Sequence, residues 1–128
     1  MVDVLRHAGH QVYATDILHG QDFLACPMPE DINSIVTNPP YAMAQSFIEK
    51  ALECVGGRGF VAMLLRCDFD HAVSRRHLFA DCGTFSKRLV LTKRIKWFEG
   101  SAGSPSFNHA WYLWNYLHDG PPTLAYAP

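Results

Sequence analysis

A tetrapeptide with two consecutive prolines, Asn38-Pro39-Pro40-Tyr41, constrains the fold of this chain more than any other feature. It follows a short apolar run, Ser34–Thr37, so we expect a strand over residues 34–38 that ends at the tetrapeptide. Prolines fix φ at about −65° and lack a backbone donor, and a residue that precedes a proline is held extended. The sequence therefore predicts a stiff loop that presents an amide, a carbonyl and an aromatic ring where α/β sheets place their ligands.

The residues after this loop alternate between helix and strand patterns. From about Ala42 to Val55, apolar residues recur at helical spacing, and Gly56-Gly57 predicts the end of that helix. Phe60–Leu65 is a continuous apolar run, which is typical of a buried parallel strand. A second helix is predicted from about Ala72 to Phe79, and two further strands over Lys87–Ile95 and Ala110–Tyr116.

The residues before the loop are less regular. Residues 2–8 have the pattern of the last turns of a helix that Gly9 ends. Val12–Thr15 predicts a short strand that ends at Asp16. Residues 117–128 are expected to form an irregular tail.

Length and composition indicate a single soluble domain. The chain has 128 residues, of which 48% are hydrophobic and 18% charged. No apolar run approaches the ~18 residues that a membrane span requires, so no membrane partner is expected. The four cysteines form no Cys-x-x-Cys pair and no metal site is predicted; reduced thiols in a cytoplasmic protein are the simplest interpretation.

Charge is unevenly distributed along a chain whose net charge is −1. Residues 66–96 hold eight basic and three acidic groups, a local charge of +5, so the remainder carries −6. Such a zone can contact the phosphates of a nucleic acid, or it can be a solvated surface with scattered salt bridges. Arg66 shows the same two alternatives, because it could face a phosphate or pair with Asp68 or Asp70.

In this setting, the tetrapeptide resembles the catalytic motif of the amino-directed, S-adenosylmethionine-dependent methyltransferases, above all those that methylate adenine N6 in DNA. The resemblance spans residues 2–116 and implies an α/β, Rossmann-like class I methyltransferase sheet. In that fold a mostly parallel sheet ends in a C-terminal antiparallel hairpin, here the strands at Lys87–Ile95 and Ala110–Tyr116. The implied cofactor is S-adenosyl-L-methionine, and the implied partner is nucleic acid, DNA in particular.

The resemblance also implies roles for individual residues. Asn38 and Pro39 would accept hydrogen bonds from the target amine, Pro40 would keep the loop stiff, and Tyr41 would stack on the base. Asp16 matches the acidic residue that binds the cofactor's ribose, and Asp22 and Phe23 resemble the pair that contacts its adenine.

Simpler interpretations stay open for several of these residues. Asp16 could be a turn residue, Asp22 a loop acid and Phe23 a core aromatic. The segment His109–Trp114 could line a base pocket or fill the core, and the loop at 99–107 could reach toward a target.

The chain departs from the family pattern at its start, because no Asp-x-Gly-x-Gly turn or preceding strand is present. That strand would lie between those ending at Asp16 and Asn38, so each would have an unpaired side. The chain could be part of a longer protein, a decayed remnant of phage origin, or one half of a site that a second chain completes. We therefore expect it to bind S-adenosylmethionine weakly or not at all by itself.

Other functions fit the same loop. Related loops act on RNA bases or on a protein glutamine amide, since each of these presents a planar NH2 group. A catalytically inactive module that only binds nucleic acid or a partner protein is a further alternative.

Overall fold

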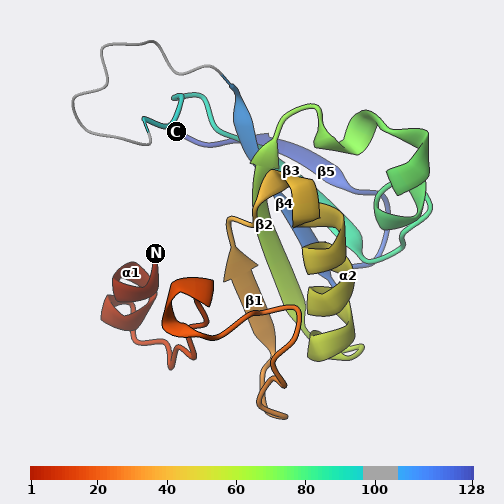
Figure 1. Cartoon of the computed structure of the whole chain (residues 1–128). Coiled ribbons are helices and arrows are strands. Elements are labelled where there is room, and N and C mark those ends of the chain that lie inside the picture. Colours follow the sequence, from red (N-terminus) through yellow and green to blue (C-terminus); the bar gives the residue numbers. More distant parts are fainter. Residues whose placement is uncertain (97–106) are drawn as a thin grey trace.

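The computed structural model describes residues 1–96 and 107–128, and it contains one five-stranded sheet with the strand order β1-β2-β4-β3-β5 (Figure 1). The strands are β1 (Ser34–Thr37), β2 (Phe60–Arg66), β3 (Phe85–Val90), β4 (His109–Asn115) and β5 (Thr123–Tyr126). The α-helices are α1 (Val2–His7) and α2 (Ala44–Val55), and the 3-10 turns are η1 (Ile17–His19), η2 (Tyr41–Met43), η3 (Phe69–His71) and η4 (Val73–Leu78). The chain is therefore α/β, as predicted.

The sheet is mixed: four of its five strands run in the same direction, as expected of a mostly parallel sheet, and β4 runs opposite to them. β1 pairs with β2 in parallel, and β3 pairs with β5 in parallel. β4 lies between β2 and β3 and is antiparallel to both. The predicted antiparallel hairpin of β3 and β4 is confirmed, but it occupies the middle of the sheet because β5 covers its outer side.

Helix α2 forms where the apolar spacing predicts it and crosses one face of the sheet (Figure 1). Its fully buried residues are Ala44, Ile48, Ala51 and Val55. The helix ends at Gly56, whose φ of 54° lies in the left-handed region that favours glycine. Ala42 and Met43, which the sequence assigned to the helix, belong instead to the tighter turn η2 (Tyr41–Met43) that links the diproline loop to α2.

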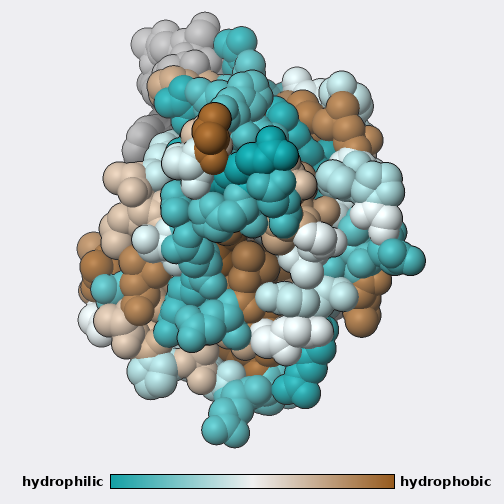
Figure 2. All heavy atoms as spheres, turned by 90° about the vertical axis from the view of Figure 1, so that its right-hand side faces the viewer, coloured by the Kyte–Doolittle hydropathy of each residue, from teal (hydrophilic) through white to brown (hydrophobic). Residues whose placement is uncertain are grey.

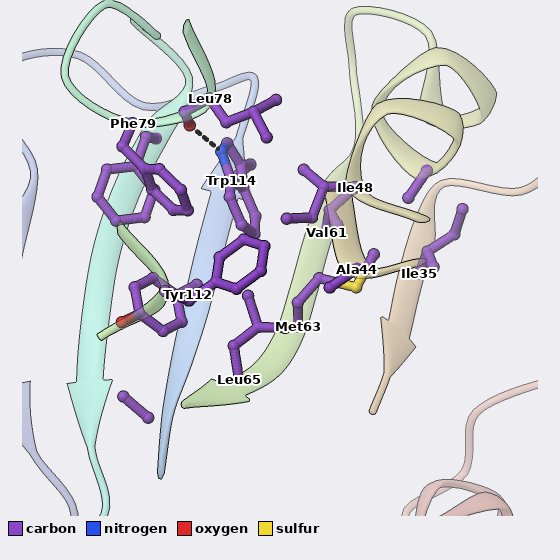
Figure 3. Packing of buried hydrophobic residues seen from close by; sticks show 14 of the residues in the cluster. Ile35, Ala44, Ile48, Val61, Met63, Leu65, Leu78, Phe79, Tyr112 and Trp114 are labelled. Atoms are coloured by element: carbon purple, nitrogen blue, oxygen red, sulfur yellow. Dashed lines mark hydrogen bonds between the residues drawn. The ribbon is translucent and has the colours of Figure 1, made fainter. Parts of the chain in front are cut away.

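The core lies between the sheet and the layer formed by α2 and η4 (Figure 3). Alternation along β4 points Tyr112 and Trp114 into this layer, and neither is exposed. Trp114 Nε1 donates to the Leu78 carbonyl at 2.7 Å, which ties η4 to the sheet. The predicted helix over 72–79 is wrong in type: the segment is a 3-10 turn, and its Leu78 carbonyl satisfies the buried indole.

The outer surface on the α2 side is amphipathic. Figure 2 shows a band of hydrophilic atoms over the middle of this face, with hydrophobic patches beside it. Among the described residues, no helix is long and apolar enough to cross a bilayer.

The C-terminal third differs from the sequence prediction in two places. β3 ends at Val90 rather than Ile95: its last ladder pair is Val90–Ala110, and one further bond joins the Leu91 amide to the carbonyl of His109, the first residue of β4. The tail at 117–128 is not irregular throughout, because β5 forms there and pairs with the outer edge of β3.

The first 33 residues form no strand. The predicted strand at Val12–Thr15 is wrong, since no described strand lies beside it to accept its hydrogen bonds. Helix α1 forms as predicted, but none of its residues is buried, and it lies apart from the sheet in Figure 1. β1 is consequently an edge strand, with β2 as its one partner among the described strands.

Candidate functional site

Three chain segments meet where β1 and β2 end and β4 begins, a border of the sheet that we call the carboxyl edge. The arrowheads of β1 and β2 both point to the top of Figure 1, where this edge lies. Parallel pairing of β1 and β2 places their last residues, Thr37 and Arg66, toward the same border. Antiparallel pairing then sets His109 opposite Arg66. Asn38-Pro39-Pro40-Tyr41, the diproline loop, follows β1 directly.

The diproline loop is mostly open to solvent. Asn38, Pro40 and Tyr41 are exposed, whereas Pro39 is buried. The Pro40 carbonyl accepts a hydrogen bond from the Met43 amide at 2.9 Å, so it belongs to the η2 turn. The role of the Pro39 carbonyl as an acceptor for a ligand amine stays a prediction.

Tyr41 reaches across the end of β2 to the first residue of β4. Its hydroxyl lies 2.5 Å from His109 Nε2, and the two rings are nearly parallel, with centroids 6.1 Å apart. Burial raises the pKa of the Tyr41 phenol, and the nearby Arg66 guanidinium acts in the opposite direction. Burial lowers the pKa of His109, as does Arg66, while a backbone hydrogen bond with Phe107 opposes this. Both partners are therefore neutral near pH 7.

Arg66 joins this cluster from β2. Its guanidinium forms a bidentate pair with Asp68, with the shorter distance 2.8 Å, which is the salt bridge that the sequence analysis left open. The same guanidinium lies 4.0 Å from the centroid of the Phe107 ring. The aromatic ring of Phe107 is itself 47% exposed. Tyr41 and Phe107 are thus two partly open aromatic rings at the carboxyl edge.

A network beneath the edge fixes the chain that follows β2. Arg88 on β3 donates to Asp70 at 3.1 Å and to the Cys67 carbonyl. The Tyr112 hydroxyl donates to the Arg66 carbonyl and to Asp70, each at 3.2 Å. Residues 66–70 are consequently held from below, which limits where Arg66 can lie.

Part of the basic zone reaches the same edge. Three of its cations are paired with the three acids of the zone: Arg66 with Asp68, Arg76 with Asp81 and Arg88 with Asp70. Lys93, Arg94 and Lys96 follow β3, whose last residues pair with the start of β4, and all three are exposed. Three of the eight cations are thus salt-bridged, as the simpler alternative expects, and Arg94 donates to Asn108 Oδ1 at 2.9 Å; contact of this zone with phosphates stays a prediction.

Each residue predicted for the cofactor makes a local or core contact of its own. Asp16 is exposed and caps η1 by accepting from the Leu18 amide at 2.9 Å. Asp22 accepts from the Leu24 amide at 2.9 Å in the same way. Phe23 is 9% exposed and stacks on Phe47 of α2 with centroids 4.9 Å apart. These are the contacts that the simpler interpretations anticipate: a turn residue, a loop acid and a core aromatic.

These contacts test whether S-adenosylmethionine fits here. Ribose recognition needs a carboxylate at a strand end beside the ligand, and Asp16 follows a segment that pairs with no described strand. An adenine ring needs an open aromatic face, and one face of Phe23 packs on Phe47. The residues present do not fit the cofactor in this arrangement.

The other candidate sites have weaker support than the carboxyl edge. A shallow hollow of about 170 Å³ lies over η3 and η4, lined by Asp70, His71, Ala72, Val73, Arg76, Phe79 and Ala80. It is smaller than the ~300–1,000 Å³ of typical ligand pockets, and it includes none of the diproline loop. The four cysteines are thiols, and the described residues contain no group of three side chains suited to a metal.

The sequence alone did not predict that Arg66, Phe107 and His109 lie beside the diproline loop. The segment 109–114 was expected either to fill the core or to line a pocket. In the structure Ala110, Tyr112 and Trp114 belong to the core, while His109 faces Tyr41. Most of the loop predicted at 99–107 falls outside the described residues, and only Phe107 can be placed. The one signal in the sequence was that Asn38 and Arg66 lie at the ends of two strands predicted to be parallel, which places both residues toward the same border of the sheet.

No protein-family model matches the chain, and no curated protein matches it.

Proposed function

We propose that this chain carries the amine-binding part of an S-adenosylmethionine-dependent N-methyltransferase whose target is an exocyclic amino group, above all adenine N6 in DNA. The proposed fold is the second part of a Rossmann-like methyltransferase sheet, with β1 and β2 as its parallel strands and β4 as the antiparallel one. The observation that supports this most is the diproline loop at the carboxyl edge, where the Asn38 amide, the Pro39 carbonyl and the Tyr41 ring come from one rigid turn.

The chemistry follows from these three groups. The lone pair of an aromatic amine is delocalised into its ring, so the nitrogen is a weak nucleophile. Hydrogen bonds from its two N–H groups to Asn38 Oδ1 and the Pro39 carbonyl favour a more tetrahedral nitrogen, and Tyr41 stacks on the base. Stacking of a base on an aromatic side chain contributes about 1–3 kcal/mol, and most of the acceleration would come from positioning. S-adenosylmethionine would supply the methyl group.

Exposed cations favour a nucleic acid over a small molecule or a protein amide. Lys93, Arg94 and Lys96 lie toward the same border as the loop, and phosphates that flank an extruded base would meet them. The RNA-base and protein-glutamine alternatives share the loop chemistry but make less use of these cations.

The misfit of Asp16, Asp22 and Phe23 limits the proposal to the amine-binding part. We predict that the 128-residue chain gives no saturable heat with S-adenosylmethionine up to about 1 mM in a calorimetric titration. Low-micromolar binding would contradict the separation between the two parts. The same misfit favours a second candidate, a module that binds nucleic acid without methylating it.

Substitution of Asn38 distinguishes the two candidates. Binding would be measured with a fluorescent oligonucleotide that contains one adenine among thymines, and transfer with radiolabelled S-adenosylmethionine. Binding and transfer would both be measured for the 128-residue chain and for a version extended by any in-frame coding sequence upstream of Met1.

The enzyme proposal expects transfer in the extended version, and it expects Asn38→Ala to abolish transfer while the oligonucleotide still binds. The isosteric Asn38→Asp is the matched control, because it keeps the shape and one acceptor oxygen but adds a charge beside the amine. Binding without transfer in every version would support the inactive module. Absence of any binding to the oligonucleotide would contradict both.

A further inference from the structure

His109 is the one described group that links the diproline loop to the middle of the sheet by a side-chain hydrogen bond. Its Nε2 lies 2.5 Å from the Tyr41 hydroxyl, across a sequence separation of 68 residues. β2 lies between β1 and β4 in the sheet, so the diproline loop and the Tyr41 side chain together connect the end of β1 to a strand that is not its neighbour.

His109 is held within the sheet, whereas Tyr41 lies on an exposed turn. His109 is 2% exposed and paired with Arg66 in the β2–β4 ladder, and its carbonyl accepts from the Leu91 amide at 3.1 Å. Tyr41 is 42% exposed and belongs to a short 3-10 turn. A surface tyrosine with no anchor would sample several rotamers, so the bond to a buried strand residue decides where its ring lies.

Both partners are neutral, so the imidazole tautomer decides the direction of the bond. Burial raises the pKa of the Tyr41 phenol, which keeps its proton, and burial lowers the pKa of His109. With its proton on Nδ1, the imidazole leaves Nε2 to accept from the phenol, and this is the tautomer that the proposed role requires.

We propose that His109 is a positioning residue that holds the Tyr41 ring in the plane in which it stacks on a bound base. It touches neither base nor methyl donor, and it acts through Tyr41. The inference rests on the proposed function for its ligand, but the hydrogen bond itself can be tested without any ligand.

The ligand-free test uses the imidazole nitrogens. The ¹⁵N chemical shifts of His109 in the 128-residue chain are expected to show a proton on Nδ1 and a hydrogen-bonded acceptor at Nε2. Tyr41→Phe removes only the hydroxyl, so the Nε2 shift should move to that of an acceptor without a donor. Unchanged ¹⁵N shifts in Tyr41→Phe would overturn the proposal, whatever the protein does with nucleic acid.

The functional test uses two amides of different reach. Glutamine can place its oxygen near the position of Nε2, while asparagine is one methylene shorter and falls short of Tyr41. With the single-adenine oligonucleotide, His109→Gln should bind within about twofold of wild type. His109→Asn and Tyr41→Phe should each bind about three- to tenfold more weakly, the worth of one hydrogen bond. The double variant Tyr41→Phe/His109→Asn should lose no more than either single variant, because both remove the same interaction.

Three outcomes separate the inference from the function on which it rests. If His109→Asn binds as wild type does while Tyr41→Ala loses binding, the base stacks on Tyr41 without help from His109, and the positioning role is overturned. If losses in the double variant add, the two residues act independently, and the role is again overturned. If wild type shows no adenine-dependent binding, the proposed function fails and the role toward a base fails with it.

Discussion

The sheet with α2 and the 33 residues before β1 both contain many apolar side chains, but they bury them to different extents. In the first region, Ile48, Met63 and Trp114 are fully buried between layers. In the second, Ile17 and Leu18 are 71% and 87% exposed, and Phe23 is the one buried residue. The contrast shows that apolar content does not make a core unless a second surface of matching periodicity lies opposite.

Matched isoleucine truncations offer the most direct way to break this comparison. Ile48→Ala leaves a cavity between α2 and the sheet and should lower the free energy of unfolding by about 4 kcal/mol, whereas Ile17→Ala should change it by no more than about 0.5 kcal/mol. Urea denaturation followed by circular dichroism measures both. Similar losses for the two variants would show that residues 1–33 are packed as tightly as the sheet.

The way in which the N-terminal region is attached gives the next largest effect. Phe23 connects it to the core by stacking on Phe47, so Phe23→Ala should cost about 2–3 kcal/mol, less than a truncation in the centre of the core. Hydrogen exchange should speed up for amides of residues 12–33 and stay unchanged in β2 and β4. Faster exchange throughout the sheet would mean that the two regions unfold as one.

The same contrast explains which parts of the fold the sequence predicts. α2 and β2 were predicted because their apolar patterns are long and each has an opposing layer. Residues 12–15 have residue types that favour a strand, yet a strand also needs a neighbour, and none is described beside them. β5 was missed for the converse reason: Thr123–Tyr126 is short and follows two prolines, but the open edge of β3 supplies its partner.

The candidate site likewise has one part that the sequence predicts and one part that it does not. The diproline loop could be predicted, since its geometry comes from the local backbone restriction of two prolines. Its connection to His109 and Arg66 could not, because it depends on β4 inserting next to β2 in antiparallel register. Phe23 was assigned a ligand role from sequence neighbours alone, and its contact with Phe47 depends on tertiary packing.

Tyr112 provides a smaller test inside the well-packed region. Its pKa is raised strongly, mainly by burial and also by the adjacent Asp70 carboxylate, so the folded state holds this proton more tightly than the unfolded state. Stability from this group is complete below about pH 10, the ordinary tyrosine pKa, and falls as the pH rises above it. Tyr112→Phe should lose about 1 kcal/mol at pH 7 with the hydroxyl's hydrogen bonds. Its stability should then fall less between pH 10 and 11 than that of wild type, and an identical fall would contradict the assignment.

His109 provides the smallest and most specific effect, at the opposite end of the pH range. Its pKa is lowered by burial first and by Arg66 second, so the unfolded state binds a proton more readily than the folded state. Stability from the neutral imidazole is therefore complete above about pH 6.5, the unperturbed value, and declines as the pH falls toward the lowered pKa of the folded protein.

The groups around His109 keep this effect interpretable. Among the described residues, Arg66 on β2 and Tyr41 on η2 are the titratable groups that face it, and Asp68 pairs with Arg66. His109→Gln keeps an acceptor for Tyr41 but cannot titrate, so the decline in unfolding free energy between pH 6.5 and 5 should be shallower than in wild type. Equal slopes for wild type and His109→Gln would mean that His109 binds its proton equally well in the folded and unfolded states, which would contradict the lowered pKa.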